Sequence, residues 1–370
     1  MMRNKNISFI DLSLSKEDHK KYVSKISRLI KTNSFIGGDE VENFQTSFSS
    51  FNKSKFCLGV ANGTDAIEIA LESLGIPKNS EVIVPNFTFL SPAEAVLRGG
   101  YKLVLADINL DDFTICTKSL KKLVSKKTSA IIVVHLFGNP CQMDDILKIA
   151  KSENLKLIED CSQSHGAQFN NTYVGNFGDI GTFSFYPTKN LGAFGDAGAI
   201  VTNQRNLYDK AKKIANHGRV KTYDHIIAGR NSRLDSIQAY VLNQKIKKLN
   251  EYNKIRISLA SFYSDNMHNE IQGIKLNKNQ KSVFHQFPIL TKKRDLLVNY
   301  LKNRGINTGI YYPKPLSKMK AFQNNHENND AKFINSDKAS KEILSIPIGP
   351  HLKIKDAEYV SSAIQSFFSK

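Results

Sequence analysis

The sequence has few cysteines, few acidic residues and no long apolar run, and each of these shortages excludes a class of protein. Only 4 of its 370 residues are cysteines, Cys57, Cys116, Cys141 and Cys161, and they lie at least 20 residues apart. Without a Cys-x-x-Cys pair, a zinc ribbon or a thioredoxin-type redox motif is excluded. The sequence therefore predicts reduced thiols, as in a cytoplasmic protein.

The longest apolar run is too short to span a membrane. It covers residues 130–137 and is interrupted by His135, whereas a membrane helix needs about 20 apolar residues. The first residues, from Met1 to Asn6, pass directly into polar sequence and contain no apolar segment of a secretory signal. We expect no membrane partner, and we expect the protein to be cytoplasmic.

The shortage of acidic residues gives the chain a formal net charge of +18, from 52 Lys and Arg against 34 Asp and Glu. Such a charge is typical of nucleic-acid binders, in which basic groups cluster against phosphates. Here the lysines are spread over the chain in short pairs, with no arginine-rich arm and no helix-turn-helix or RNA-binding signature. We therefore expect no nucleic-acid partner, and a positive field that favours small anionic ligands.

The length and the apolar pattern predict an α/β protein of two domains, at about 150 residues per domain. Short β-branched runs alternate with helical patterns in the first two thirds, which is typical of a mainly parallel sheet. The predicted strands are 81–84, 103–106, 130–134, 155–159, 182–185 and 198–201, and the predicted helices are 64–74, 143–153, 207–216 and 234–250.

The pattern changes after residue 250, where we place the boundary between a large domain (1–250) and a smaller α+β domain (251–370). Residues 284–290 and 309–312 are expected to form isolated short strands there. The first 30 residues or so are expected to pack on the smaller domain.

Gly63 and Thr64 stand where a strand passes into a helix. Free amides at a helix N-terminus, with a hydroxyl at the cap, form a site for a phosphate. Taken alone, the segment is better explained as an ordinary helix cap.

Asp160 and Gln163 follow a buried strand, at the edge where open α/β sheets bind ligands. Asp160 could pair with a cationic ring nitrogen, and Gln163 could donate to a phenolate oxygen. The alternative is that Asp160 caps the next turn.

Lys189 lies between a short apolar strand and a segment that contains Gly192, Gly195 and Gly198. Glycines let the backbone approach a ligand and partly remove an ammonium group from water, which lowers its pKa. A Schiff-base lysine needs this change. The alternative is a solvated lysine, which is the common case in a chain so rich in lysine.

The order of these segments resembles the DegT/StrS family of pyridoxal-phosphate sugar aminotransferases. The resemblance rests on Gly63-Thr64-Asp65-Ala66, Asp160-x-x-Gln163-x-x-Gly166, Ser184-Phe185-x-x-x-Lys189-x-Leu191-Gly192, His217-Gly218, Gly229-x-Asn231-Ser232-Arg233-Leu234-Asp235, Tyr312-Pro313-x-Pro315-Leu316 and Leu344-Ser345-Ile346-Pro347. These motifs extend over nearly the whole chain and are specific in combination.

The resemblance implies a fold type I transferase, with a large domain built on a mainly parallel seven-stranded sheet and a small α+β domain at the C-terminus. It also implies a homodimer with a shared active site and pyridoxal 5'-phosphate as the cofactor, with no metal. Lys189 would form the Schiff base, Asp160 would pair with the pyridine nitrogen, and Gln163 would contact the ring hydroxyl.

The remaining site residues follow from the same resemblance. Gly63, Thr64 and Ser184 would bind the cofactor phosphate. Phe89 would stack on the ring, and Asn231 would reach the phosphate from the partner subunit. The residues that would contact the substrate are Arg233, Tyr311 and Tyr312.

The implied reaction moves the amino group of L-glutamate onto a nucleotide-linked keto sugar in two half-reactions and releases 2-oxoglutarate. The segment 217–235 most resembles relatives that act on UDP-linked 3-keto sugars, in amino-sugar and surface polysaccharide or lipopolysaccharide biosynthesis. Tyr311 departs from the histidine of many relatives, and a 4-keto-6-deoxy sugar linked to dTDP, UDP or GDP is the alternative acceptor. Another fold type I enzyme, without affinity for nucleotides, and a basic binding protein are the other hypotheses.

Overall fold

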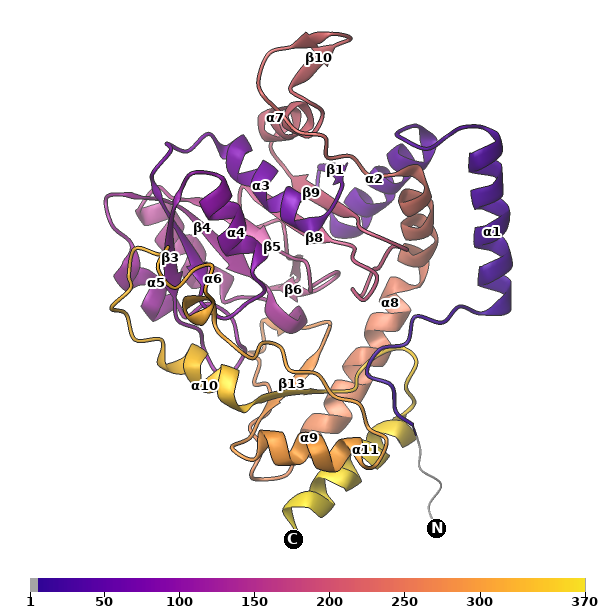
Figure 1. Cartoon of the computed structure of the whole chain (residues 1–370), viewed down its shortest axis with the longest axis vertical. Coiled ribbons are helices and arrows are strands. Elements are labelled where there is room, and N and C mark those ends of the chain that lie inside the picture. Colours follow the sequence, from indigo (N-terminus) through magenta and orange to yellow (C-terminus); the bar gives the residue numbers. More distant parts are fainter. Residues whose placement is uncertain (1–5, 370) are drawn as a thin grey trace.

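The structure of the protein, a computed structural model, describes residues 6–369 (Figure 1). The predictions drawn from residues 1–5 therefore lie outside the described residues, as do both outer limits of the predicted domains. Within residues 6–369, no helix combines the length and the apolar character that crossing a membrane requires.

Within the described residues, seven strands form the central sheet, in the order β1-β9-β8-β5-β4-β2-β3. Their bounds are β1 Phe56–Val60, β2 Glu81–Pro85, β3 Lys102–Ala106, β4 Thr128–Val134, β5 Lys156–Asp160, β8 Ile180–Ser184 and β9 Gly198–Thr202. β9 is antiparallel to both of its neighbours, and the other strands run in one direction. The expectation of an α/β fold with a mainly parallel sheet of seven strands is confirmed.

The strands are apolar on both faces because helices cover both sides of the sheet. Val82 and Val84 face the helices α3 (Gly63–Leu74), α4 (Ser91–Arg98) and α7 (Arg205–Ala215). Ile83, between them, points to the opposite face, toward α5 (Thr117–Leu123) and α6 (Met143–Ser152). α2 (Asp39–Asn52) covers the β8–β9 side. This alternation with a period of two residues fixes the register of the strands.

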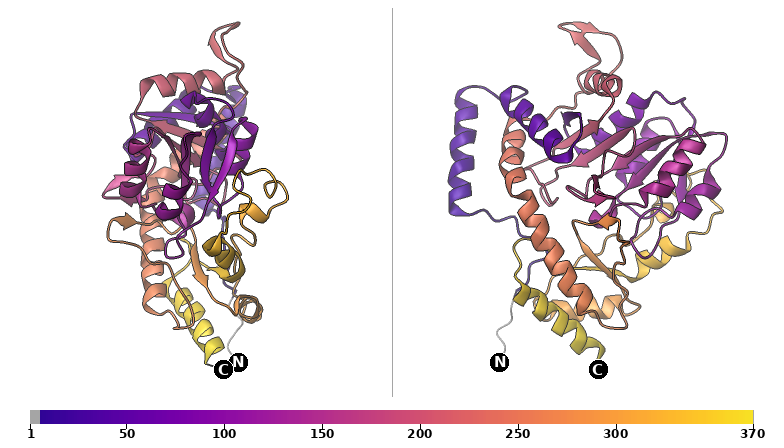
Figure 2. Two further views of the ribbon diagram at one scale, coloured as in Figure 1. Left: turned by 90° about the vertical axis from the view of Figure 1, so that its left-hand side faces the viewer. Right: turned by 180° about the vertical axis from the view of Figure 1, so that it is seen from behind.

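Helix α8 (Ser236–Asp265) joins the sheet to the C-terminal part of the chain (Figure 2). It begins close to the predicted position but extends well beyond residue 250, because its sequence contains neither glycine nor proline. The predicted boundary at residue 250 therefore lies inside a continuous helix. The division into two domains stays a prediction.

The C-terminal part packs around the second half of α8. Leu259 and Tyr263 of α8 contact the pair β13–β14, and the helices α9 and α11 complete this core. The bounds are α9 Arg294–Lys302, β13 Phe287–Leu290, α10 Ile334–Glu342, β14 Ile343–Ile346 and α11 Ile354–Phe368. The strand expected at 309–312 is wrong, because this segment makes only an isolated bridge between Gly309 and Ser345.

The N-terminal segment packs mainly on the first half of α8, which precedes residue 250. In α1 (Lys16–Lys31), the ring of Tyr22 lies 6.1 Å from that of Tyr240, and Asp18 pairs with Lys248. Ile7 joins the C-terminal core instead. The expected packing on the smaller domain thus describes the residues around Ile7 and does not describe α1.

Short strands complete the described chain: β6 Gln168–Phe169, β7 Thr172–Tyr173, β10 Arg219–Lys221, β11 Asp224–His225 and β12 Gln280–Lys281. β10 and β11 form a hairpin that projects from the body of the molecule (Figure 1). Tyr223 at its tip is 94% exposed.

Candidate active site

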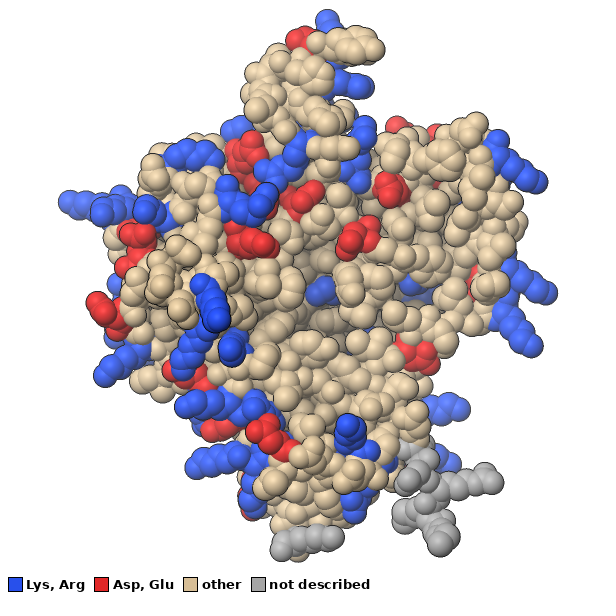
Figure 3. All heavy atoms as spheres, viewed as in Figure 1, with Lys and Arg blue, Asp and Glu red and all other residues tan. Residues whose placement is uncertain are grey.

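A cavity of about 1160 Å³ opens at the carboxyl ends of β5 and β8, beside the first turn of α3. This edge of the sheet is where open α/β folds bind ligands. The predicted site residues that line it are Gly63, Thr64, Phe89, Asp160, Gln163, Ser184, Lys189, Tyr311 and Tyr312. Segments far apart in the sequence thus meet at one cavity. Lys and Arg are dispersed over the face shown in Figure 3 and form no single patch there.

Lys189 is on the loop that follows β8, in a tight turn in which its amide donates to the carbonyl of Tyr186 (2.8 Å). Burial lowers the pKa of the Lys189 ammonium to about 8, and the carboxylate of Asp160 opposes this shift. Gly192 permits the turn, because a Cβ at this position would collide with the carbonyl of Pro187. The loop therefore holds an amine that is partly neutral near neutral pH, as nucleophilic lysines require.

Asp160 is the last residue of β5 and is buried. Burial raises the pKa of its carboxyl group, while the amide of Ser162 (3.0 Å from Oδ1) and the Lys189 ammonium favour the ionised form. The bond from Ser162 shows that Asp160 does cap the following turn, as the alternative interpretation held. One of its oxygens makes this contact, and the residue still lines the cavity.

The first turn of α3 forms a cradle of small residues next to the end of β8. The N-cap of α3 is Asn62, whose side chain accepts from the amide of Asp65 (2.8 Å). The expectation of a hydroxyl at the cap is therefore wrong. The amides of Gly63 and Thr64 have no acceptor within the helix. A Cβ at Gly63 would lie 2.6 Å from the Cβ of Ser184, so only glycine allows this approach.

Gln163 is oriented by its neighbours. Its Oε1 accepts from the amide of Phe137 (2.7 Å), so its Nε2 faces the hydroxyl of Tyr312, to which it donates (3.2 Å). A primary amide has two N–H donors, and the second remains available on the cavity side.

Aromatic rings form part of the wall of the cavity. The ring centroids of Phe89 and Tyr312 are 6.1 Å apart, and Tyr311 stacks on Phe9 at 6.0 Å. Phe89 is 50% exposed, so its ring is free to stack on a planar ligand. Burial raises the pKa of the Tyr312 hydroxyl far above its ordinary value, which keeps it protonated. Phe9 was not predicted as a site residue, since it lies outside every motif.

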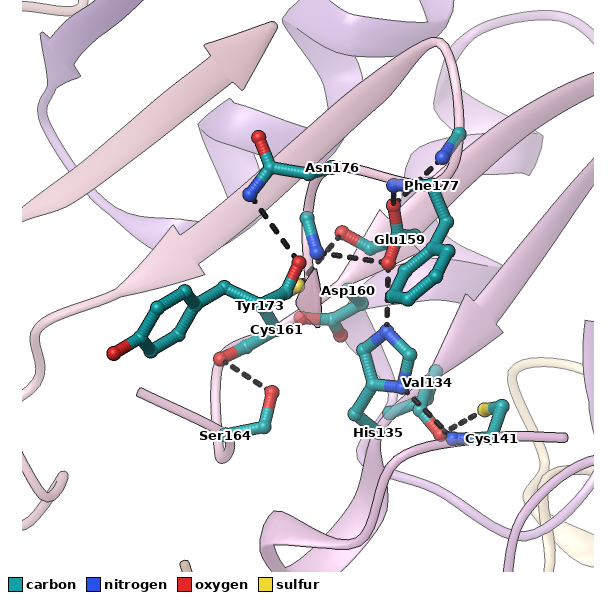
Figure 4. A network of polar contacts seen from close by, with 12 residues as sticks. Val134, His135, Cys141, Glu159, Asp160, Cys161, Ser164, Tyr173, Asn176 and Phe177 are labelled. Atoms are coloured by element: carbon teal, nitrogen blue, oxygen red, sulfur yellow. Dashed lines mark hydrogen bonds and ion pairs between the residues drawn. The ribbon is translucent and has the colours of Figure 1, made fainter. Parts of the chain in front are cut away.

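A buried polar network supports β5 behind Asp160 (Figure 4). The carboxylate of Glu159 accepts from the amides of Gly175 (2.8 Å), Phe177 (2.7 Å) and Gly178 (2.7 Å). His135 completes this set, with Nε2 3.1 Å from a Glu159 oxygen. Glu159 was not predicted as a functional residue, because nothing in a strand pattern reveals a buried carboxylate with several donors.

The tautomer of His135 follows from its other nitrogen. Nδ1 accepts from the amide of Cys141 (3.0 Å), so the proton is on Nε2 and points at Glu159. His135, Glu159 and Cys161 offer metal-ligating atoms within 4.8 Å of one another. Since the Glu159 oxygens already accept four N–H donors, we interpret the cluster as support for the end of β5.

Asn231 and Arg233 do not line this cavity. Both are exposed, on the segment that follows the β10–β11 hairpin. Asn231 lines a shallow neighbouring pocket together with Asn62 and Thr64. The roles predicted for Asn231 and Arg233 stay predictions.

The residues around the cavity fit pyridoxal phosphate. A partly neutral lysine faces a carboxylate that can hold a proton on a ring nitrogen, an amide can donate to a ring oxygen, and a helix start can hold a phosphate. Lys189, Asp160 and Gln163 supply the first three groups, and α3 supplies the last. Fold and site together define a pyridoxal-phosphate-dependent transferase of fold type I.

Comparison with known proteins gives the family. A model of the DegT/DnrJ/EryC1/StrS aminotransferase family matches residues 16–365, and the chain belongs to this family. It is therefore a pyridoxal-phosphate-dependent aminotransferase, as the motifs implied.

Two curated relatives are similar over most of their length. A dTDP-3-amino-3,6-dideoxy-α-D-galactopyranose transaminase of Aneurinibacillus thermoaerophilus is 36% identical, over 98% of this chain and 99% of its own. A UDP-N-acetyl-3-dehydro-α-D-glucosamine 3-aminotransferase of Acidithiobacillus ferrooxidans is 36% identical, over 92% of each chain. The crystal structure of S. venezuelae DesV with a ketimine intermediate has a TM-score of 0.94 at 32% identity and covers 99% of both chains.

Proposed function

We propose that this aminotransferase transfers the amino group of L-glutamate to a UDP-linked 3-keto sugar. The observation that carries the proposal is the position of Lys189, at the wall of a cavity of about 1160 Å³. Ligand pockets for small molecules span roughly 300–1000 Å³. The cavity is therefore large enough for a nucleotide-linked sugar beside the cofactor.

Pyridoxal phosphate, when bound, supplies an electron sink for negative charge that develops on the carbon bearing the amino group. Lys189 Nζ, as a neutral amine, would accept the proton from this carbon and, as an ammonium group, would deliver it to the cofactor. A pKa of about 8 leaves part of the amine neutral at physiological pH. Asp160 remains the negative group that holds a proton on the ring nitrogen.

The acceptor is inferred from the relatives and from the aromatic wall. Both curated relatives described above are named for 3-amino or 3-dehydro sugars, and one of them for a UDP sugar. Tyr311 and Tyr312 lie side by side in the cavity, with ring centroids 5.8 Å apart, where they can contact the sugar. A 4-keto-6-deoxy sugar linked to dTDP, UDP or GDP is the second candidate.

We also propose a homodimer with a shared active site. Asn231 and Arg233 are exposed and lie outside the cavity of their own chain. In a dimer, they could reach the cavity of the second copy. The adjacent hairpin carries exposed apolar side chains, Tyr223 and Ile226 among them. The amino sugar made by such an enzyme in the cytoplasm would serve surface polysaccharide biosynthesis.

The test is the visible absorbance of the purified protein with pyridoxal phosphate, before and after L-glutamate. Bleaching of the yellow band, with release of 2-oxoglutarate, is expected. UDP-, dTDP- and GDP-linked 3-keto and 4-keto sugars are then compared for return of the colour. If the colour returns only with a 4-keto sugar, the proposed acceptor is wrong. If L-glutamate does not bleach the band, the proposed donor is wrong. The Lys189→Ala variant should show neither change.

A further inference from the structure

Arg256 of α8 lines the cavity and has an unusual set of partners. One of its guanidinium nitrogens donates to three backbone carbonyls, of Phe284 (3.3 Å), His285 (3.2 Å) and Ile348 (3.1 Å). Among residues 6–369, no carboxylate pairs with it. Burial lowers the pKa of the Arg256 guanidinium to about 10, and no neighbouring charge offsets this effect.

Arg256 is half-buried, and a charge partly removed from water without a counter-ion is normally compensated by the protein. The three carbonyls supply only partial negative charge to one nitrogen of the fork. A guanidinium has five N–H donors, so donors remain on the side of the cavity. Arg256 therefore has the charge and the donor geometry for a bidentate anion.

A second donor lies beside it. Gln286 also lines the cavity, and its Oε1 accepts from the hydroxyl of Ser345 (3.1 Å). This bond fixes the carbonyl side of the amide, so its N–H group remains for a ligand.

His285 connects this place to the catalytic lysine. Its Nδ1 lies 3.0 Å from Oδ1 of Asn190, the residue that follows Lys189. Burial and the cations Lys189 and Arg256 keep the pKa of His285 well below its ordinary value. His285 is thus neutral, and Arg256 is the positive group on this side of the lysine.

We propose that Arg256 binds a carboxylate of the amino-acid donor, with the amide of Gln286 as a second donor group. A carboxylate is planar and carries one charge on two oxygens, which matches the fork of the guanidinium. The other cations of the cavity wall on α8, Lys245, Lys247 and Lys248, lie two to three helical turns earlier. The inference rests on the proposed function, because it assumes that an amino acid supplies the amino group.

The two half-reactions provide the test, because only the first uses the carboxylate. In the Arg256→Gln variant, loaded with pyridoxal phosphate, the glutamate concentration for half-maximal bleaching should rise by at least roughly 30-fold. The second half-reaction, with the keto-sugar nucleotide, should change by less than about threefold. Equal losses in both half-reactions, or no loss for glutamate, would overturn the proposal.

A binding measurement distinguishes the loss of ligand binding from poor folding of the variant. 2-Oxoglutarate should raise the melting temperature of the wild-type holoprotein, and it should not raise that of Arg256→Gln. Gln286→Glu keeps the shape of the side chain but places a negative charge next to the carboxylate of the ligand. This variant should therefore also bind L-glutamate more weakly, and its half-reaction with the keto-sugar nucleotide should stay unchanged. Lys254→Gln, an exposed cation on the same helix, is the control and should behave as wild type.

The outcomes separate the two proposals. If L-glutamate does not bleach the wild-type protein, the proposed donor is wrong. If it bleaches the wild type and Arg256→Gln equally well, only the role of Arg256 is wrong.

Discussion

The side-chain amide of Gln163 donates to the hydroxyl of Tyr312 over 3.2 Å. This contact joins a loop after β5 to a segment of the C-terminal part, 149 residues later in the chain. The amide of Phe137 fixes which end of Gln163 faces the tyrosine. The tyrosine proton is thus left for a ligand, and the contact joins the residue predicted to bind the cofactor to one predicted to bind the substrate.

The Tyr312→Phe variant should keep its cofactor and lose affinity for the sugar. The hydroxyl contributes one neutral hydrogen bond, so we expect the keto-sugar nucleotide to bind about 3- to 10-fold more weakly. The half-reaction with glutamate should change less. Measuring both half-reactions by absorbance gives the answer, and a larger loss for glutamate would contradict the assignment of Tyr312 to the substrate.

The rate at which the apoprotein takes up pyridoxal phosphate should rise with pH through about 8. Only the neutral amine of Lys189 attacks the aldehyde, and burial lowers the pKa of this amine to about 8. Since Asp160 raises that pKa, Asp160→Asn should move the midpoint to lower pH. Stopped-flow absorbance measures the rate. A midpoint near that of solvated lysines, at about 10.4, would show that Lys189 is not desolvated.

The Gly63→Ala variant should bind pyridoxal phosphate more weakly. The added Cβ would lie 2.6 Å from the Cβ of Ser184 and would push apart the two sides of the cradle. Crowding of this kind costs about 1–3 kcal/mol, or roughly 5- to 150-fold in affinity.

A double variant provides the control for Gly63→Ala. In the Ser184→Gly background the clashing atom is absent, so adding Gly63→Ala should cost little more. Titration of each apoprotein with the cofactor gives the dissociation constants. Equal effects of Gly63→Ala in both backgrounds would show that the contact does not matter.

The Glu159→Gln variant should unfold more easily. An amide cannot accept four N–H donors, and its own N–H group would face either the amides of Phe177 and Gly178 or the amide of Gly175 and the ring N–H of His135. The free energy of unfolding should fall by about 2–4 kcal/mol, as measured by denaturant titration. Glu153→Gln, on an exposed glutamate, should change it by less than about 0.5 kcal/mol. A Glu159→Gln variant as stable as this control would contradict the supporting role of the network.

Local sequence was enough to locate six of the seven described strands of the central sheet, all except β1, and the segments at the cavity. The continuous apolar runs around Val82 and Ile131 arise from burial on both faces, and this signal does not depend on the rest of the fold. Lys189 and Asp160 were found because each stands next to a strand end, and the topology brings those ends together. The family motifs then supplied roles that spacing alone left open.

The predictions that failed depend on contacts between distant segments. The end of α8 was set too early, because its apolar residues beyond Leu249 pack on the C-terminal part, which the local pattern does not reveal. The cap of α3 is Asn62, whose side-chain oxygen takes the place of the expected hydroxyl. No sequence pattern indicated a role for Arg256, because its three carbonyl partners come from other segments of the chain.

The unbroken course of α8 has a consequence for how this chain can vary. Lys245 donates to the carbonyl of Gly192, on the loop that carries Lys189, and Arg256 donates to three carbonyls of the C-terminal part. A single inserted or deleted residue between them would turn one side chain by about 100° relative to the other. The interval between Lys245 and Arg256 is therefore a fixed length, and surface loops elsewhere are the places where the chain can grow or shrink.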